Sequence, residues 1–143
     1  MTDHWVLDFL GRPWVPGADG PCAYDCWGLV RAVYRYRYSI DLPVIPADAE
    51  SILSIKSAIA DGVRIVKWES IPSPCEGAVL LMSHGKIPHH VGVVVMVCGQ
   101  PHVLHAVEGS GVVIQDLVSL KLHGWNVREI CKVLEDAGNH PSQ

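Results

Sequence analysis

The chain has few charged residues and no long apolar segment. Lys, Arg, Asp and Glu make up 18% of its 143 residues, and the formal net charge is −4. This balance excludes the strongly basic surface of a nucleic-acid-binding protein, and no apolar run approaches the length of a membrane span. We therefore expect neither nucleic acid nor a membrane as a partner. The first residues lack the charged-then-apolar arrangement of a signal peptide, which predicts synthesis in the cytoplasm.

Metal-binding patterns are also missing. The five cysteines are an odd number and include no Cys-x-x-Cys pair, and the eight histidines match no compact zinc motif. We therefore expect no metal and no other cofactor. A Cys22–Cys26 bridge is possible but would block the Cys26 thiol. Otherwise four cysteines are interpreted as structural or incidental: Cys22, Cys75, Cys98 and Cys131.

The length suits one domain, residues 1–143, with a core at about 5–134 and a frayed tail from 135 to 143. Helices before an antiparallel sheet give an α+β arrangement. Periodicity predicts helices at 3–10, 26–38 and 47–60, a turn or short helix at 117–122, and strands at 63–68, 78–82, 91–97, 103–107, 112–115 and 127–133.

Asp25 and Cys26 open the amphipathic segment at 26–38. Apolar residues at 26, 29, 30 and 33 share one helical face, while Arg31 and the later arginines are expected on a solvated face. Asp25 is a good N-cap, so Cys26 is predicted at the first helical position. Free N–H groups and the helix dipole there would favour a thiolate and lower the thiol pKa. A small buried apolar cysteine is the alternative interpretation.

Two histidines fall on neighbouring predicted strands. A hairpin turn centred on Cys98-Gly99 pairs residues 97 and 100, which places His105 opposite Gly92. His90 is then a diagonal neighbour of His105 on the same face, roughly 7–8 Å away. Gly92 leaves room above the sheet for an imidazole. A turn with an odd number of loop residues would place the histidines on opposite faces.

These residue types suit nucleophilic attack on an amide. Cys26 would attack a carbonyl carbon, His90 would take the thiol proton and return it to the leaving amine, and His105 would orient His90. The backbone N–H of Cys26 is the candidate oxyanion donor. Taken singly, His90 could be a surface residue and His105 a core residue. The order Cys, His, His favours the catalytic interpretation.

Three ordered motifs carry a family resemblance, and a fourth segment at 10–15 adds to it. They are Tyr24-Asp25-Cys26-Trp27-Gly28-Leu29-Val30, His90-Val91-Gly92-Val93 and Leu104-His105-Ala106. The chain resembles the NlpC-type cell-wall cysteine peptidases over roughly residues 5–131. The resemblance implies a papain-like fold, with N-terminal helices packed on an antiparallel sheet, and a Cys-His-His catalytic triad. Within the family it is most similar to short single-domain proteins encoded with phage tail genes.

The chain departs from the family pattern at three places. Trp27 replaces the usual Ser, Trp14 replaces the usual Tyr, and Gly77-Ala78 replaces Gly-Asp. In peptidoglycan endopeptidases of the family, the first two polar residues and the Asp before the Cys help to recognise a free amine. The resemblance therefore implies a substrate-binding role for Asp25, and we expect Trp14 and Trp27 to face the substrate. Trp27 is expected to be exposed.

Four functions remain open from the sequence. The first is a cysteine hydrolase that cleaves amide bonds in peptidoglycan stem peptides, carried to the cell wall by a phage or prophage tail. The second is a tail-assembly component that docks to tail-tip proteins, with Trp27 in the docking surface and little or no hydrolysis. The others are acyl transfer through the same thioester and a cytoplasmic amidase unrelated to phage.

Overall fold

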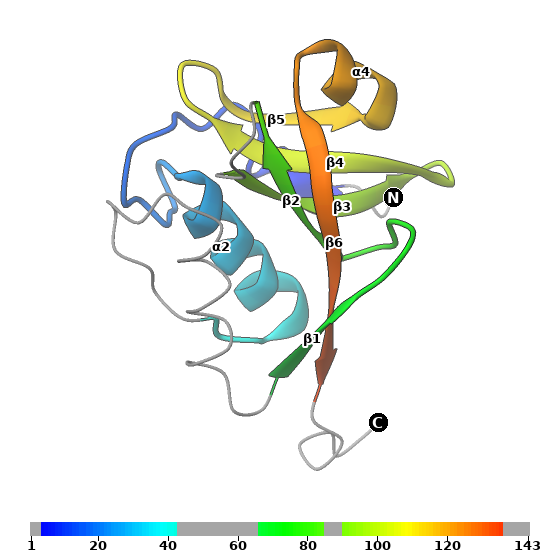
Figure 1. Cartoon of the computed structure of the whole chain (residues 1–143). Helices are drawn as coiled ribbons and strands as arrows, with labels where there is room; N and C mark the ends of the chain where they lie inside the picture. Colours follow the sequence, from blue (N-terminus) through cyan, green and yellow to red (C-terminus); the bar gives the residue numbers. More distant parts are fainter. Residues whose placement is uncertain (1–3, 43–65, 85–89, 136–143) are drawn as a thin grey trace.

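Six antiparallel strands and three helices form the part of the chain that the computed structural model describes, residues 4–42, 66–84 and 90–135. Figure 1 shows their arrangement. The helices are α1 (His4–Leu7), α2 (Cys26–Tyr38) and α4 (Leu117–Leu122). The strands are β1 (Val66–Ser70), β2 (Val79–Ser83), β3 (His90–Val97), β4 (Gln100–Val107), β5 (Gly111–Asp116) and β6 (Asn126–Glu135). The predicted α+β class is confirmed.

The strands lie in the order β1-β6-β2-β3-β4-β5, and neighbours run antiparallel. In the β3–β4 hairpin, Val97 pairs with Gln100 and Val93 pairs with Leu104. This is the register predicted from a turn at Cys98-Gly99. Both turn residues have positive φ angles, 51° and 79°, as a tight two-residue hairpin requires.

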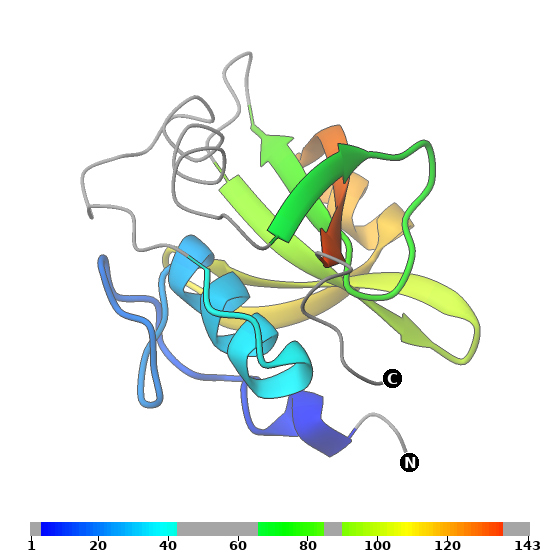
Figure 2. The ribbon, with the colours of Figure 1, turned by 90° about the horizontal axis from the view of Figure 1, so that it is seen from below.

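Two apolar cores lie on opposite sides of the sheet. The larger one joins Leu29 and Val30 of α2 to Val93 of β3 and its odd-numbered neighbours. The smaller one joins Val94 and the even-numbered side of β3 to α4 and Trp125. Figures 1 and 2 show α2 and α4 on these two sides. Because side chains alternate along a strand, His90 faces the same side as Val94.

Helix α2 is buried around most of its circumference rather than on one face. All residues from Trp27 to Tyr34 are buried, and Trp27 is only 6% exposed. The prediction of an exposed Trp27 is therefore wrong. Arg31, predicted on a solvated face, is also buried, where its guanidinium pairs with Asp19 at 2.6 Å and donates to the carbonyl of Leu42 at 3.0 Å. Amphipathic spacing underestimated the burial because flanking chain covers the second side of the helix.

Predicted element positions agree with the structure to within a few residues. Helix α2 and helix α4 have the predicted bounds, whereas α1 is shorter than the predicted helix at 3–10. The predicted helix at 47–60 and residues 136–143 of the predicted tail lie outside the described residues. Within the described part, no helix is long and apolar enough to cross a membrane.

Candidate active site

Asp25 fixes the start of α2, as predicted. Its Oδ1 accepts a hydrogen bond from the N–H of Gly28 at 2.6 Å, and its Oδ2 accepts one from Gly17 at 2.8 Å. The carboxylate thus ties the preceding loop to the first turn. Gly28 permits this close approach, because a Cβ there would lie 2.0 Å from the carbonyl oxygen of Ala18. Cys26 consequently occupies the first helical position.

The Cys26 thiol lies where the start of α2 meets the start of β3. The backbone N–H groups of Val91, Trp27 and Cys26 all lower the pKa of the Cys26 thiol. Burial has the larger, opposite effect and raises that pKa from 9.0 to about 11. The predicted low thiol pKa is therefore wrong, because desolvation outweighs the helix N-terminus. At neutral pH the thiol keeps its proton and needs a base to become a nucleophile.

His90 and His105 are joined directly. The Nε2 of His90 lies 2.8 Å from the Nδ1 of His105, and both rings are buried. The diagonal arrangement predicted from the hairpin register is confirmed. Gly92 provides the space, because a Cβ there would lie 3.0 Å from the His105 Cβ and 2.7 Å from a Val103 methyl. Since Val91 N–H contacts the Cys26 thiol, the thiol lies against the residue that follows His90.

His105 is held neutral. Burial lowers its pKa from 6.5 to about 4, although a hydrogen bond to Gln115 acts in the opposite direction. Its Nε2 lies 2.8 Å from the Oε1 of Gln115, so both ring nitrogens have partners. His105 can therefore orient His90 without competing for its proton near neutral pH.

Trp125 covers the ring of His90. The two rings are stacked with centroids 4.3 Å apart and an angle of 19° between planes. His84 stacks on Trp125 as well, at 3.5 Å and 22°. Trp125 is 7% exposed and also meets the edge of His105. Its ring contacts thus include three histidines, His84, His90 and His105.

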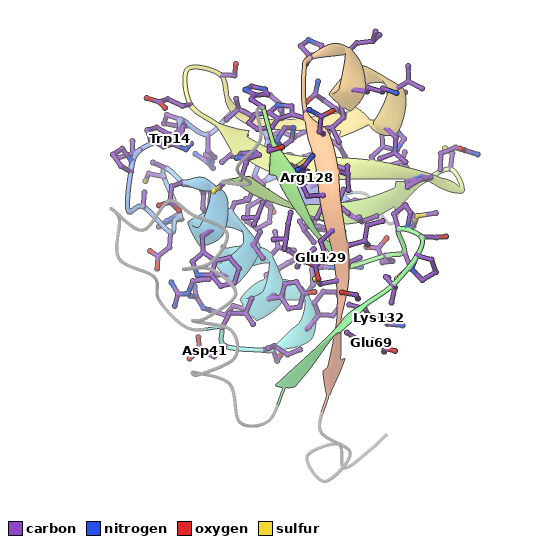
Figure 3. All side chains as sticks on the ribbon, in the orientation of Figure 1. Trp14, Asp41, Glu69, Arg128, Glu129 and Lys132 are labelled. Carbon is purple, nitrogen blue, oxygen red and sulfur yellow. The ribbon has the colours of Figure 1, made fainter. Side chains whose placement is uncertain are left out.

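The predicted substrate-binding residues are not all brought to one surface. Trp14 lies on the loop before α2 (Figure 3) and is half-buried against the larger core. Its backbone forms an isolated β-bridge with Tyr24. Asp25 has both oxygens engaged by backbone N–H groups. Trp27 is buried in the larger core. Substrate binding by these residues stays a prediction. For Trp27 the prediction rested on an exposed side chain, and the structure shows a buried one.

The sequence interpretation missed Gln115. The β4–β5 register pairs His105 with Val113, so Gln115 lies diagonally from His105 on the same face. That is the same geometric step that relates His90 to His105. Gln115 was visible as the end of a predicted strand, so extending the register argument by one hairpin would have found it.

The cysteines and the other histidines of the described residues form no metal site. All five cysteines are free thiols, so Cys22 and Cys26 are not bridged. Among residues 4–42, 66–84 and 90–135, no group of three or more His, Cys, Asp or Glu side chains is placed to hold a metal ion.

Comparisons with known proteins agree with this architecture. One solved structure, the NlpC/p60 domain of the peptidoglycan hydrolase SagA, aligns with a TM-score of 0.52 and 19% identity. The alignment covers 85% of this chain and 86% of that one, which shows a shared fold. No curated protein matches the sequence. The NlpC/P60 family matches residues 11–129, which span both strand motifs and the start of α2. The chain belongs to the NlpC/P60 family.

Proposed function

We propose that the protein is a cysteine hydrolase that cleaves amide bonds in peptidoglycan stem peptides. Cys26 is the nucleophile, His90 is the general base and acid, and His105 orients His90. The observations that carry the proposal are the 2.8 Å bond between His90 and His105 and the contact of the Cys26 thiol, at the start of α2, with the backbone N–H of Val91, the residue after His90. Membership of a family of cell-wall cysteine peptidases and amidases supports the reaction class.

In the first half-reaction, His90 takes the thiol proton as the Cys26 sulfur attacks the amide carbon. The backbone N–H of Cys26 donates to the oxygen that becomes negative. The C–N bond then breaks, the amine leaves with the proton held by His90, and a thioester remains. A water molecule next gives its proton to His90 and attacks the thioester. The products are a carboxylic acid and the regenerated thiol.

The raised thiol pKa makes His90 essential to this scheme. A pKa of about 11 leaves roughly one thiol in ten thousand ionised at neutral pH. Proton removal in the same step as attack avoids the need for a standing thiolate. The neighbouring N–H groups of Val91 and Trp27 stabilise the charge as it forms on sulfur.

The substrate class rests on likeness. SagA, whose NlpC/p60 domain shares the fold, is described as a peptidoglycan hydrolase. Two segments, Asp25–Arg31 and Leu104–Gly109, resemble those of proteins encoded with phage tail genes. They support a role as a phage or prophage tail-associated enzyme, made in the cytoplasm and acting at the cell wall, with tail-tip proteins as partners.

The test is digestion of purified peptidoglycan and of defined stem peptides, read by mass spectrometry. Wild type should yield pairs of fragments, one with a new amine and one with a new acid, whose masses sum to substrate plus one water. Cys26→Ala should yield none, while Cys98→Ala, a matched change at an exposed thiol in the β3–β4 turn, should behave as wild type. Equal cleavage by Cys26→Ala would overturn the assignment. Absence of fragments with wild type would favour a docking role without hydrolysis.

A further inference from the structure

Gln115 extends the histidine pair by one more hydrogen bond. Its Oε1 lies 2.8 Å from the Nε2 of His105, whose Nδ1 faces the Nε2 of His90. Resting on the proposed function of Cys26 and His90, we propose that Gln115 is a positioning residue that sets the direction of proton donation along this chain. By doing so it selects the form of His90 that can act as a base.

The donors and acceptors along this chain of hydrogen bonds fix where each proton lies. A neutral imidazole has one N–H donor and one acceptor nitrogen, whereas an amide oxygen only accepts. Facing the Gln115 oxygen, neutral His105 must carry its proton on Nε2. Its Nδ1 is then an acceptor, so the contacting Nε2 of His90 must carry the proton. The Nδ1 of His90 is left as the nitrogen that lacks a proton and can take one from a thiol.

The opposite arrangement is unproductive. With an amide N–H facing Nε2 of His105, this histidine would carry its proton on Nδ1 and donate it to His90. His90 would then hold its own proton on Nδ1 and could not accept another while neutral. Since burial keeps His105 neutral, its one proton has only these two places. The orientation of the Gln115 amide thus decides whether neutral His90 can accept a proton on Nδ1.

Helix α4 holds the amide in place. The Nε2 of Gln115 lies 3.1 Å from the Oγ of Ser119, which accepts its hydrogen bond. It also lies 3.1 Å from the Nδ1 of His123, but that nitrogen is 2.8 Å from the carbonyl oxygen of Ser119 and donates there. Asp116 caps α4 by accepting from the N–H of Ser119 at 2.7 Å. The Ser119 hydroxyl is therefore presented at a fixed position at the end of β5.

Two substitutions separate proton direction from mere packing. Gln115→Met keeps the length of the side chain but removes the acceptor, so both tautomers of His105 become accessible. Gln115→Glu keeps an acceptor facing His105 and should preserve the wild-type tautomers. Gln100→Met, at an exposed position at the start of β4, is the matched control for the loss of an amide.

The first readout is ¹⁵N NMR of labelled protein at about pH 8, where unperturbed histidines are neutral. Wild type, Gln115→Glu and Gln100→Met should show His90 protonated on Nε2, while Gln115→Met should show a mixture of tautomers. The second readout is hydrolysis of stem peptides. Gln115→Met should lower kcat about tenfold or more with little change in KM. Gln115→Glu should recover kcat near pH 8, and its acid limb should move to higher pH because a carboxylate raises the His105 pKa.

The NMR result stands apart from activity. A wild-type His90 protonated on Nδ1, or a Gln115→Met spectrum with the wild-type tautomers, would overturn the proposal. If wild type showed the expected tautomers but no hydrolysis, the direction of proton donation would be supported and the proposed hydrolase function would be contradicted. Loss of kcat in Gln115→Met with unchanged tautomers would assign the residue to packing alone.

Discussion

The indole of Trp125 lies flat on the imidazole of His90, with ring centroids 4.3 Å apart and planes within 19°. This contact covers one face of the ring that we propose as the base, while the edge of that ring bonds to His105. A stacked indole also favours a positive charge on the ring, because its π face is negative. Trp125 therefore restrains the His90 ring, and in the proposed reaction it would favour the protonated form.

Replacing Trp125 by Leu should lower kcat about tenfold and reduce the free energy of unfolding by about 2–4 kcal/mol, because a large core side chain and its ring contacts are lost. Trp125→Phe should retain more of both, since it keeps an aromatic face. The measurements are stem-peptide hydrolysis and urea unfolding. Similar kcat values for the Leu and Phe variants would contradict a role for the aromatic face.

Gly92→Ala should displace His105 from its position beside His90. The added Cβ would lie 2.7 Å from a Val103 methyl and 3.0 Å from the His105 Cβ. We expect the free energy of unfolding to fall by about 1–3 kcal/mol. The rate of stem-peptide hydrolysis should fall by a larger fraction than the free energy of unfolding. Adding Val103→Ala should relieve the first contact but not the second. Recovery of full activity in the double variant would show that the displacement of His105 is unimportant.

Protein stability should fall as pH decreases from 6.5 toward 4. The folded pKa of His105 is lowered to about 4, whereas its unfolded value is 6.5. Between pH 4 and 6.5 His105 therefore binds a proton more readily in the unfolded state, and this protonation favours unfolding. Above pH 6.5 His105 is neutral in both states, and its contribution to the free energy of unfolding is fully present. The loss is on the order of 3 kcal/mol across the window. Urea unfolding should show a shallower pH slope for His105→Gln than for wild type, and equal slopes would contradict the assignment.

Alkylation should reveal the raised pKa of the Cys26 thiol. Because burial raises it to about 11, the rate with iodoacetamide should keep increasing through alkaline pH, by about tenfold per unit. Peptide mass spectrometry resolves Cys26 from the exposed Cys98 in the same sample. The pKa of about 11 predicts no plateau in the Cys26 alkylation rate below that pH. A plateau below pH 8 would mean that the helix N-terminus and His90 outweigh desolvation.

Removal of the N-cap should destabilise α2 and the loop before it together. Asp25→Ala eliminates the acceptors for the N–H groups of Gly28 and Gly17, and we expect a loss of about 1–2 kcal/mol in unfolding free energy. Asp8→Ala, at an exposed position after α1, is the control. If Asp25→Ala instead raised KM without lowering stability, substrate binding would be its main role.

The β3–β4 hairpin was predictable because its cause is local. A two-residue turn at Cys98-Gly99 fixes the pairing, and the period of two in side-chain direction then brings His105 to the face of His90. The N-cap at Asp25 was equally local, since capping depends on the first turn alone. Both features follow from a few adjacent residues.

Burial was the property that the sequence could not supply. Trp27 and Arg31 were assigned to an exposed side of α2, yet both are buried. The predicted thiol pKa failed for the same reason, because the helix N-terminus is visible in the sequence but desolvation depends on what covers Cys26. The stack of Trp125 on His90 was likewise hidden, since 35 positions separate them along the chain.

The order of elements, the hairpin register and the choice of Cys26, His90 and His105 as catalytic candidates could be inferred from the amino-acid sequence, because turn chemistry, capping and side-chain alternation act over short distances. The environment of those residues depends instead on how the chain folds. The fold places Trp125 over His90, joins Gln115 to His105 and partly buries the Cys26 thiol. These contacts join strands and helices distant in sequence, and their effects on pKa and protonation depend on solvent exclusion by the whole fold.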